Sequence, residues 1–110
     1  MTDEQPVDPF WAALLGLLRE LGPVVERRSR YADKPALWLH GREIAHSENS
    51  GVVDLRITRR GWTNIRDLVV HDRAVERDPA RRDWIILRGT LSDVERLRFV
   101  LAAAIEANGG

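Results

Sequence analysis

Several side chains able to do acid–base and binding chemistry gather in the segment 38–56 of this 110-residue chain. His40, Glu43 and Asp54 can accept and release protons, and Arg56 can bind an anion through its planar guanidinium. Apolar residues alternate with these polar ones, a pattern typical of a strand with one face on a core and the other in water. We therefore expect the four side chains to share the solvent-facing side of a sheet.

Three short segments must position these side chains. Polar and apolar residues alternate over residues 36–40, 43–47 and 52–58. Gly41-Arg42 and residues 48–51 interrupt the alternation as turns would. The pattern therefore predicts a three-stranded antiparallel meander.

Reading Gly41-Arg42 as a two-residue turn sets the register of this meander. His40 then faces Glu43, and the second turn brings Glu43 opposite Arg56 and Ala45 opposite Asp54. The core face is predicted to carry Leu37, Leu39, Ile44, Val53, Leu55 and Ile57. The outer face is predicted to carry Trp38, His40, Glu43, Asp54 and Arg56. A slip of one residue would mix the apolar and polar sets, which supports this register.

His46 departs from the pattern, because this register points it toward the core beside Leu37. A buried neutral imidazole needs a hydrogen-bond partner, and both a structural histidine and a ligand-binding one fit the sequence. We expect no metal site. His40 and His46 fall on opposite faces, His71 lies beyond the second helix, and the chain has no cysteine.

The rest of the sequence predicts helices that flank the strands. The expected helices run from Pro9 to Leu21, from Thr58 onward, and from a capping box at Ser92 to Ala107. Residues 84–88 predict a fourth strand, and residues 24–35 an irregular connection. Residues 71–83 are too long for an ordinary connection and are expected to be a mobile or functional loop, unless they form a short helix.

This order of elements predicts an α+β fold. Its antiparallel sheet is expected to have four to five strands, with helices packed on one face. Residues 1–7 are expected to be a disordered tail, and residues 8–110 a single domain.

The composition favours a cytoplasmic protein without nucleic-acid or membrane partners. Seventeen basic residues balance seventeen acidic ones, so no net charge attracts nucleic acid or an anionic membrane. No apolar run is long enough to span a bilayer. The absence of cysteine excludes a disulfide framework. The sequence contains neither a glycine-rich phosphate loop nor a dinucleotide fingerprint, and it identifies no cofactor.

A set of short motifs runs through residues 24–107. They are Arg28-Ser29-Arg30, Gly41-Arg42-Glu43, Ala45-His46 and Asp54-Leu55-Arg56, followed by a strand at Trp84 and a C-terminal helix. At these positions the chain resembles the luciferase domain-containing family of small bacterial and fungal proteins, which implies a domain of unknown function. Where family members often have a second histidine, this chain has Ser47-Glu48. The order of elements is also similar to frataxin-like and YjbR-like domains.

The function expected from the sequence is the binding of a small molecule or a protein partner on the outer face of the sheet. The candidate binding residues are Trp38, His40, Arg42, Glu43, His46, Asp54 and Arg56. One alternative is an acid–base enzyme that uses His40, Glu43 and Asp54 on this face. Another is a homodimer interface on the same surface.

Overall fold

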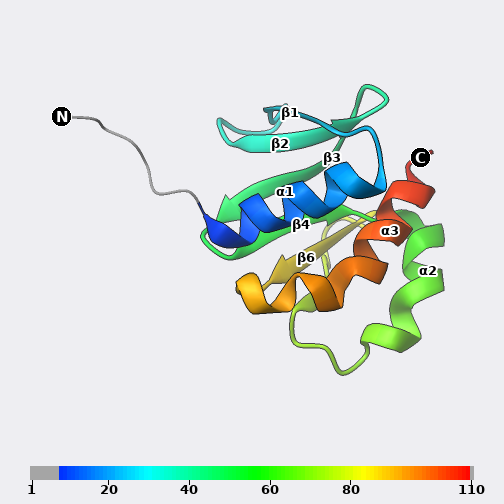
Figure 1. Ribbon diagram of the computed structural model, residues 1–110. Coiled ribbons are helices and arrows are strands. Elements are labelled where there is room, and N and C mark those ends of the chain that lie inside the picture. Colours follow the sequence, from blue (N-terminus) through cyan, green and yellow to red (C-terminus); the bar gives the residue numbers. More distant parts are fainter. Residues whose placement is uncertain (1–7, 110) are drawn as a thin grey trace.

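Six antiparallel strands form one sheet, and three α-helices lie against one of its faces within the part of the chain that the structure describes (Figure 1). The structure is a computed structural model describing residues 8–109, so the tail expected at residues 1–7 lies outside it. The strands are β1 (Val25–Arg28), β2 (Pro35–Leu39), β3 (Arg42–Asn49), β4 (Val52–Arg56), β5 (Val75–Arg77) and β6 (Trp84–Arg88). The helices are α1 (Pro9–Leu21), α2 (Thr58–Val69) and α3 (Arg98–Ala107).

The strands lie in the order β1-β2-β3-β4-β6-β5. This arrangement confirms the predicted α+β class with an antiparallel sheet, although the sheet has six strands rather than four to five. The two additional strands are the edges, β1 and β5. All four residues of β1 are exposed, and β5 has only three residues. Neither segment therefore carries the apolar alternation by which a half-buried strand is recognised.

The core lies between the helices and the inner face of the sheet. The side-chain carboxylate of Asp8 accepts a hydrogen bond from the backbone N–H of Phe10 at 3.1 Å, and Pro9 follows it, so α1 begins where the sequence predicts. The helix buries Phe10, Leu14 and Leu18. The predicted inner-face residues Leu37, Leu39, Ile44, Val53, Leu55 and Ile57 are all buried.

The last helix is preceded by two short 3₁₀ turns, η1 (Leu91–Asp93) and η2 (Glu95–Leu97). A capping box is present, but it joins Thr90 to Asp93 and does not begin at Ser92. The expected helix therefore starts later, at Arg98. Its residues Val100, Leu101 and Ala104 are buried in the core.

The turn between β2 and β3 is formed by His40 and Gly41, one residue earlier than predicted. Leu39 pairs with Arg42, and the φ angles of His40 and Gly41 are 51° and 79°. Two consecutive residues with positive φ are typical of a two-residue hairpin turn of type I′, and glycine adopts this conformation without strain. His40 is consequently an exposed turn residue and does not face Glu43.

A bulge in β3 then changes which side chains share a face. Trp38 pairs with Glu43, whereas the next paired residues are Leu37 and Ala45, so Ile44 is the extra residue. Ile44 and Ala45 are both buried in the core. The alternation resumes one residue late, as expected of a bulge. His46 therefore lies on the outer face, opposite Asp54 on β4, and the prediction that it points into the core is wrong.

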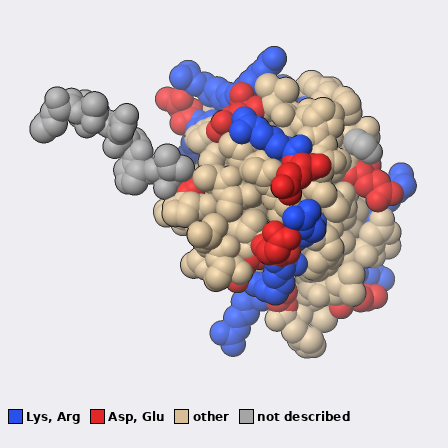
Figure 2. Space-filling view, in the orientation of Figure 1, with Lys and Arg blue, Asp and Glu red and all other residues tan. Residues whose placement is uncertain are grey.

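The face that carries the helices has no large patch of one charge. In Figure 2, acidic and basic side chains lie beside one another across this view. Arg98, the first residue of α3, forms ion pairs with both Glu95 and Glu20. None of the helices in residues 8–109 is long and apolar enough to cross a membrane.

Candidate functional site

Three ionisable residues are buried at the centre of the outer face of the sheet. Glu43, His46 and Asp54 are 3%, 3% and 4% exposed. Residues 29–34, which join β1 to β2, and residues 78–83, which join β5 to β6, supply the hydrogen-bond partners that lie over them. The outer face is therefore not the open, solvated surface that the alternation of the sequence suggests.

Glu43 is held by three hydrogen bonds. The Ser29 hydroxyl donates to Oε2 at 2.7 Å, and the backbone N–H of Arg30 donates to Oε1 at 2.7 Å. Nδ1 of His46 lies 2.9 Å from Oε2. The same serine hydroxyl accepts a hydrogen bond from the backbone N–H of Tyr31 at 3.0 Å. The carboxylate thus fixes the segment that follows β1 over the sheet.

The second ring nitrogen of His46 faces two further carboxylates. Nε2 lies 2.9 Å from Oδ2 of Asp54 and 3.0 Å from Oε1 of Glu48. We call Glu43, His46, Glu48 and Asp54 the histidine cluster. Burial alone would lower the pKa of His46, but the hydrogen bonds and negative charges of Asp54 and Glu43 raise it above the ordinary value. Burial raises the pKa of Asp54, but bonds from His46 and Arg81 outweigh that effect and lower it.

Arg81 connects the cluster to the loop before β6. Its guanidinium donates to Asp54 Oδ2 at 2.7 Å and to Asp78 Oδ2 at 2.8 Å. Asp78 also accepts a hydrogen bond from the backbone N–H of Ala80 at 2.8 Å. The segment expected to be a mobile or functional loop therefore includes β5 and an ordered turn that contributes Arg81 to the outer face.

Two aromatic rings pack around the imidazole. The ring centroids of His46 and Trp84 are 5.2 Å apart, and those of His46 and Tyr31 are 6.1 Å apart. The Arg81 guanidinium lies 5.0 Å from the centroid of the Trp84 ring. Trp84 is buried, whereas Tyr31 is 63% exposed. An exposed aromatic side chain beside buried charges is a common element of ligand recognition.

A pocket of about 280 Å³ adjoins the histidine cluster. We call it the arginine pocket, and its lining residues are Arg30, Tyr31, Gly41, Arg42, Glu43, Arg56 and Trp84. Within residues 8–109, the side chains of Arg30 and Arg42 form no ion pair. The guanidinium of Arg56 donates a hydrogen bond to the side-chain oxygen of Asn108, and its second terminal nitrogen lies 3.5 Å from Oδ2 of Asp83.

The arginine pocket brings together only part of the predicted binding set. Arg42, Glu43 and Arg56 line it, and His46 and Asp54 lie in the adjoining cluster. Trp38 is on the outer face but outside the pocket lining, where its indole N–H donates to the backbone carbonyl of Arg28 at 3.3 Å. His40 is confined to the turn.

Sequence reasoning missed the residues that cover the outer face. They are Ser29, Arg30, Tyr31, Glu48, Arg81 and Trp84. The motif Arg28-Ser29-Arg30 contains the first two, but no residue pattern indicates that this segment folds over Glu43. Arg81 could not be placed, because it follows an edge strand that the pattern does not reveal.

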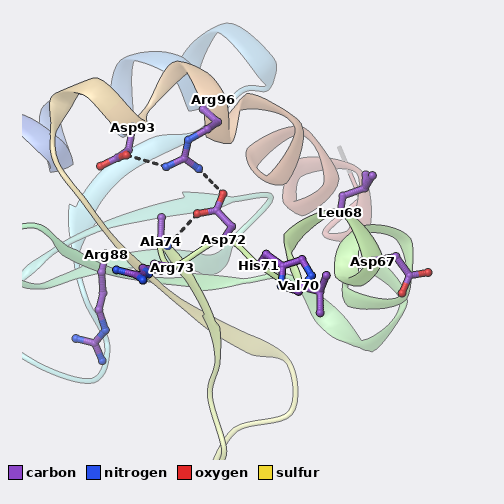
Figure 3. Close-up of a pocket in the computed structure, with 10 residues that line it drawn as sticks. All are labelled: Asp67, Leu68, Val70, His71, Asp72, Arg73, Ala74, Arg88, Asp93 and Arg96. Atoms are coloured by element: carbon purple, nitrogen blue, oxygen red, sulfur yellow. Dashed lines mark hydrogen bonds and ion pairs between the residues drawn. The ribbon is translucent and has the colours of Figure 1, made fainter.

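A larger hollow of about 580 Å³ lies between the end of α2, the start of β5 and η1 (Figure 3). Three of its charged groups pair with one another: Arg96 pairs with both Asp72 and Asp93, and Asp72 accepts a hydrogen bond from the Ala74 N–H at 2.9 Å. Of its arginines, only Arg73 forms no ion pair within residues 8–109. The hollow therefore offers fewer unpaired charged groups to a ligand than the arginine pocket.

Comparison with known proteins finds no family model, curated protein or solved structure that matches this chain.

Proposed function

We propose that this protein is a binding module for a small organic anion, which the arginine pocket holds on the outer face of the sheet. The observation that carries the proposal is that three arginine residues, Arg30, Arg42 and Arg56, line one pocket together with two aromatic residues, Tyr31 and Trp84. Guanidinium groups bind carboxylates and phosphates through paired hydrogen bonds.

The volume and the lining residues of the arginine pocket limit the size and the chemistry of a ligand that it can hold. At about 280 Å³, the pocket is near the lower end of the range for small-molecule sites, roughly 300–1,000 Å³. Tyr31 offers an exposed ring against which a flat group can pack, and the buried Trp84 ring lies edge-on to it with the two centroids 6.3 Å apart. A small carboxylate or phosphate ester with one aromatic ring satisfies both features.

The histidine cluster has a supporting role in this proposal. Glu43 anchors the backbone of Arg30 and, through Ser29, that of Tyr31. Two residues of the pocket wall are thereby positioned before a ligand arrives. Such preorganisation reduces the conformational entropy that binding would otherwise cost.

The alternative of an acid–base enzyme receives less support from this geometry. Both ring nitrogens of His46 already face carboxylates, and both oxygens of Glu43 already accept hydrogen bonds. Neither group is free to take a proton from a ligand in the pocket, as a general base must. A binding role requires no such proton transfer.

Membership of the luciferase domain-containing family, and a bacterial and cytoplasmic setting, belong to the same proposal. The supporting observation is that its motif residues Arg30, Arg42, Glu43 and Arg56 contribute to one pocket. A protein partner or a second copy of the chain on this face remains the competing reading. Light scattering that finds a dimer at micromolar concentration would favour the second copy.

Titration with phenyl phosphate and benzoate, followed by NMR of the tryptophan indole and arginine side-chain signals, tests the anion proposal. We expect saturable shifts at Trp84 and Arg42 and none at Trp62, on the far side of the sheet. Benzyl alcohol, which has the ring without the charge, serves as the matched control. Equal shifts with the alcohol, or shifts confined to Trp62, would refute anion binding in the arginine pocket.

A further inference from the structure

We propose that His46, Glu48 and Asp54 form a binding site for one divalent transition-metal ion. The site lies beside the arginine pocket and does not depend on the anion proposal. Its donor atoms are one imidazole nitrogen and two carboxylate oxygens, all within 4.8 Å of one another. Zn²⁺ and Co²⁺ accept this combination of nitrogen and oxygen ligands.

The spacing of the donor atoms suits a single ion. His46 Nε2 lies 2.9 Å from Asp54 Oδ2 and 3.0 Å from Glu48 Oε1. Ligands at roughly 2.1 Å from one ion, at right angles or somewhat more, lie roughly 3 Å or slightly more from each other. The three atoms can therefore become ligands with only small movements of their side chains.

Two carboxylates compete for one hydrogen-bond donor of His46. A fully protonated imidazole has two N–H groups, and three carboxylates face His46. Glu43 faces Nδ1, so Glu48 and Asp54 share the single N–H on Nε2. A metal ion in place of that proton can bind both carboxylates at the same time.

The three carboxylates that face the imidazole concentrate negative charge at the site. They belong to Glu43, Glu48 and Asp54. Arg81 pairs with Asp54, and Lys34 pairs with Glu48 at 3.3 Å. A cation at Nε2 is attracted directly by the carboxylates of Glu48 and Asp54, and by the charge of Glu43 across the ring.

Glu43 orients the histidine for metal binding. Its contact with Nδ1 favours the tautomer with the proton on Nδ1 and the lone pair on Nε2, directed toward Glu48 and Asp54. Metal-binding histidines commonly donate their other N–H to a carboxylate in this way. Ser29 and the Arg30 N–H hold Glu43 in turn. Glu43 is therefore a positioning residue and not a ligand.

An ion can reach the site from solvent past Glu48. The side chain of Glu48 is 37% exposed, whereas those of His46 and Asp54 are 3% and 5% exposed. Lys34 contacts Glu48 through Oε2, which leaves Oε1 directed at the imidazole. The partly exposed carboxylate can thus close over an ion that the two buried ligands hold.

Titration of the chelator-treated full-length chain with Zn²⁺ and Co²⁺ tests the proposal. We expect one equivalent to bind with micromolar or tighter affinity by calorimetry, Zn²⁺ to raise Tm, and Co²⁺ to develop visible absorption. Glu48→Gln should weaken binding at least about tenfold, as loss of supporting or coordinating groups does. Absence of saturable binding at millimolar metal overturns the proposal.

Control variants locate the ion. Glu76→Gln removes an exposed carboxylate of β5 that pairs with Arg88, and it should leave the metal affinity unchanged. Unchanged binding in Glu48→Gln, or binding lost in His71→Gln, would place the ion elsewhere and overturn the assignment. Because Glu48 is partly exposed, its variant is expected to fold, and circular dichroism verifies this.

Discussion

Glu43 and His46 lie three residues apart on β3 and yet point to the same side of the sheet. In a regular strand this separation places two side chains on opposite faces. The bulge at Ile44 restores them to one face and allows the 2.9 Å contact between Glu43 Oε2 and His46 Nδ1. The whole polar assembly on the outer face depends on this irregularity.

Glu43 is predicted to be essential for stability. Glu43→Ala leaves the Ser29 hydroxyl, the Arg30 N–H and His46 without their buried acceptor, and should lower the free energy of unfolding by about 3–5 kcal/mol. Glu43→Gln keeps the shape and should cost about 1–3 kcal/mol. Urea denaturation measures both. A loss below 0.5 kcal/mol in the alanine variant, as at ordinary surface sites, would contradict the described network.

Replacing Arg81 should destabilise the protein much more than replacing its neighbour Arg82. Arg81→Ala removes the cation that faces the buried carboxylate of Asp54, and we expect a loss of about 1–3 kcal/mol. Arg82 is exposed and forms no ion pair among residues 8–109, so Arg82→Ala should change stability by less than about 0.5 kcal/mol. Thermal unfolding of the two variants side by side makes the comparison. Equal effects would mean that the loop does not hold Arg81 over the sheet.

Substitutions at the two adjacent residues of the β2–β3 turn are predicted to change the stability of the protein in different directions. Gly41→Ala forces a side chain into a left-handed conformation and should destabilise by about 1–2 kcal/mol. His40→Asn places at the first turn position a residue that tolerates this conformation, and should be neutral or stabilising. Chemical denaturation is the measurement. A strongly destabilised His40→Asn would indicate that the histidine ring makes contacts beyond the turn.

Arg42 should affect ligand binding without affecting folding. Its side chain is exposed and lines the arginine pocket, so Arg42→Ala should weaken phenyl phosphate binding at least about tenfold while leaving the unfolding free energy nearly unchanged. Arg27, an exposed residue of β1 outside the pocket, provides the matched alanine control. Full affinity in Arg42→Ala would show that this guanidinium is not part of the anion site.

The apolar half of the sheet could be predicted from the sequence because burial selects residue type directly. Leu37, Ile44 and Leu55 lie on the inner face as expected, since an alternation of apolar residues has only one favourable placement over a core. The inner-face prediction is correct although the predicted strand register is wrong. Both Ile44 and Ala45 are apolar and buried, so the shift of one residue leaves the inner face apolar.

The polar half could not be predicted in the same way. Nothing in the composition of β3 distinguishes a bulge at Ile44 from regular pairing, and the bulge decides the position of His46. Ser29 and Arg81 reach the cluster from loops, where hydrophobic periodicity carries no information. The candidate residues Glu43, Asp54 and Arg56 were found from their types, but their partners required the structure.

The side chain of Asn108 links the end of α3 to Arg56. Its amide nitrogen donates to the Arg56 backbone carbonyl at 2.8 Å, and its oxygen accepts from the Arg56 guanidinium. Helix α3 thus helps to orient the guanidinium of Arg56, a residue that lines the arginine pocket on the outer face of the sheet. Shortening or fusing the chain near this asparagine would therefore remove both contacts and free the Arg56 guanidinium, which belongs to the proposed anion site.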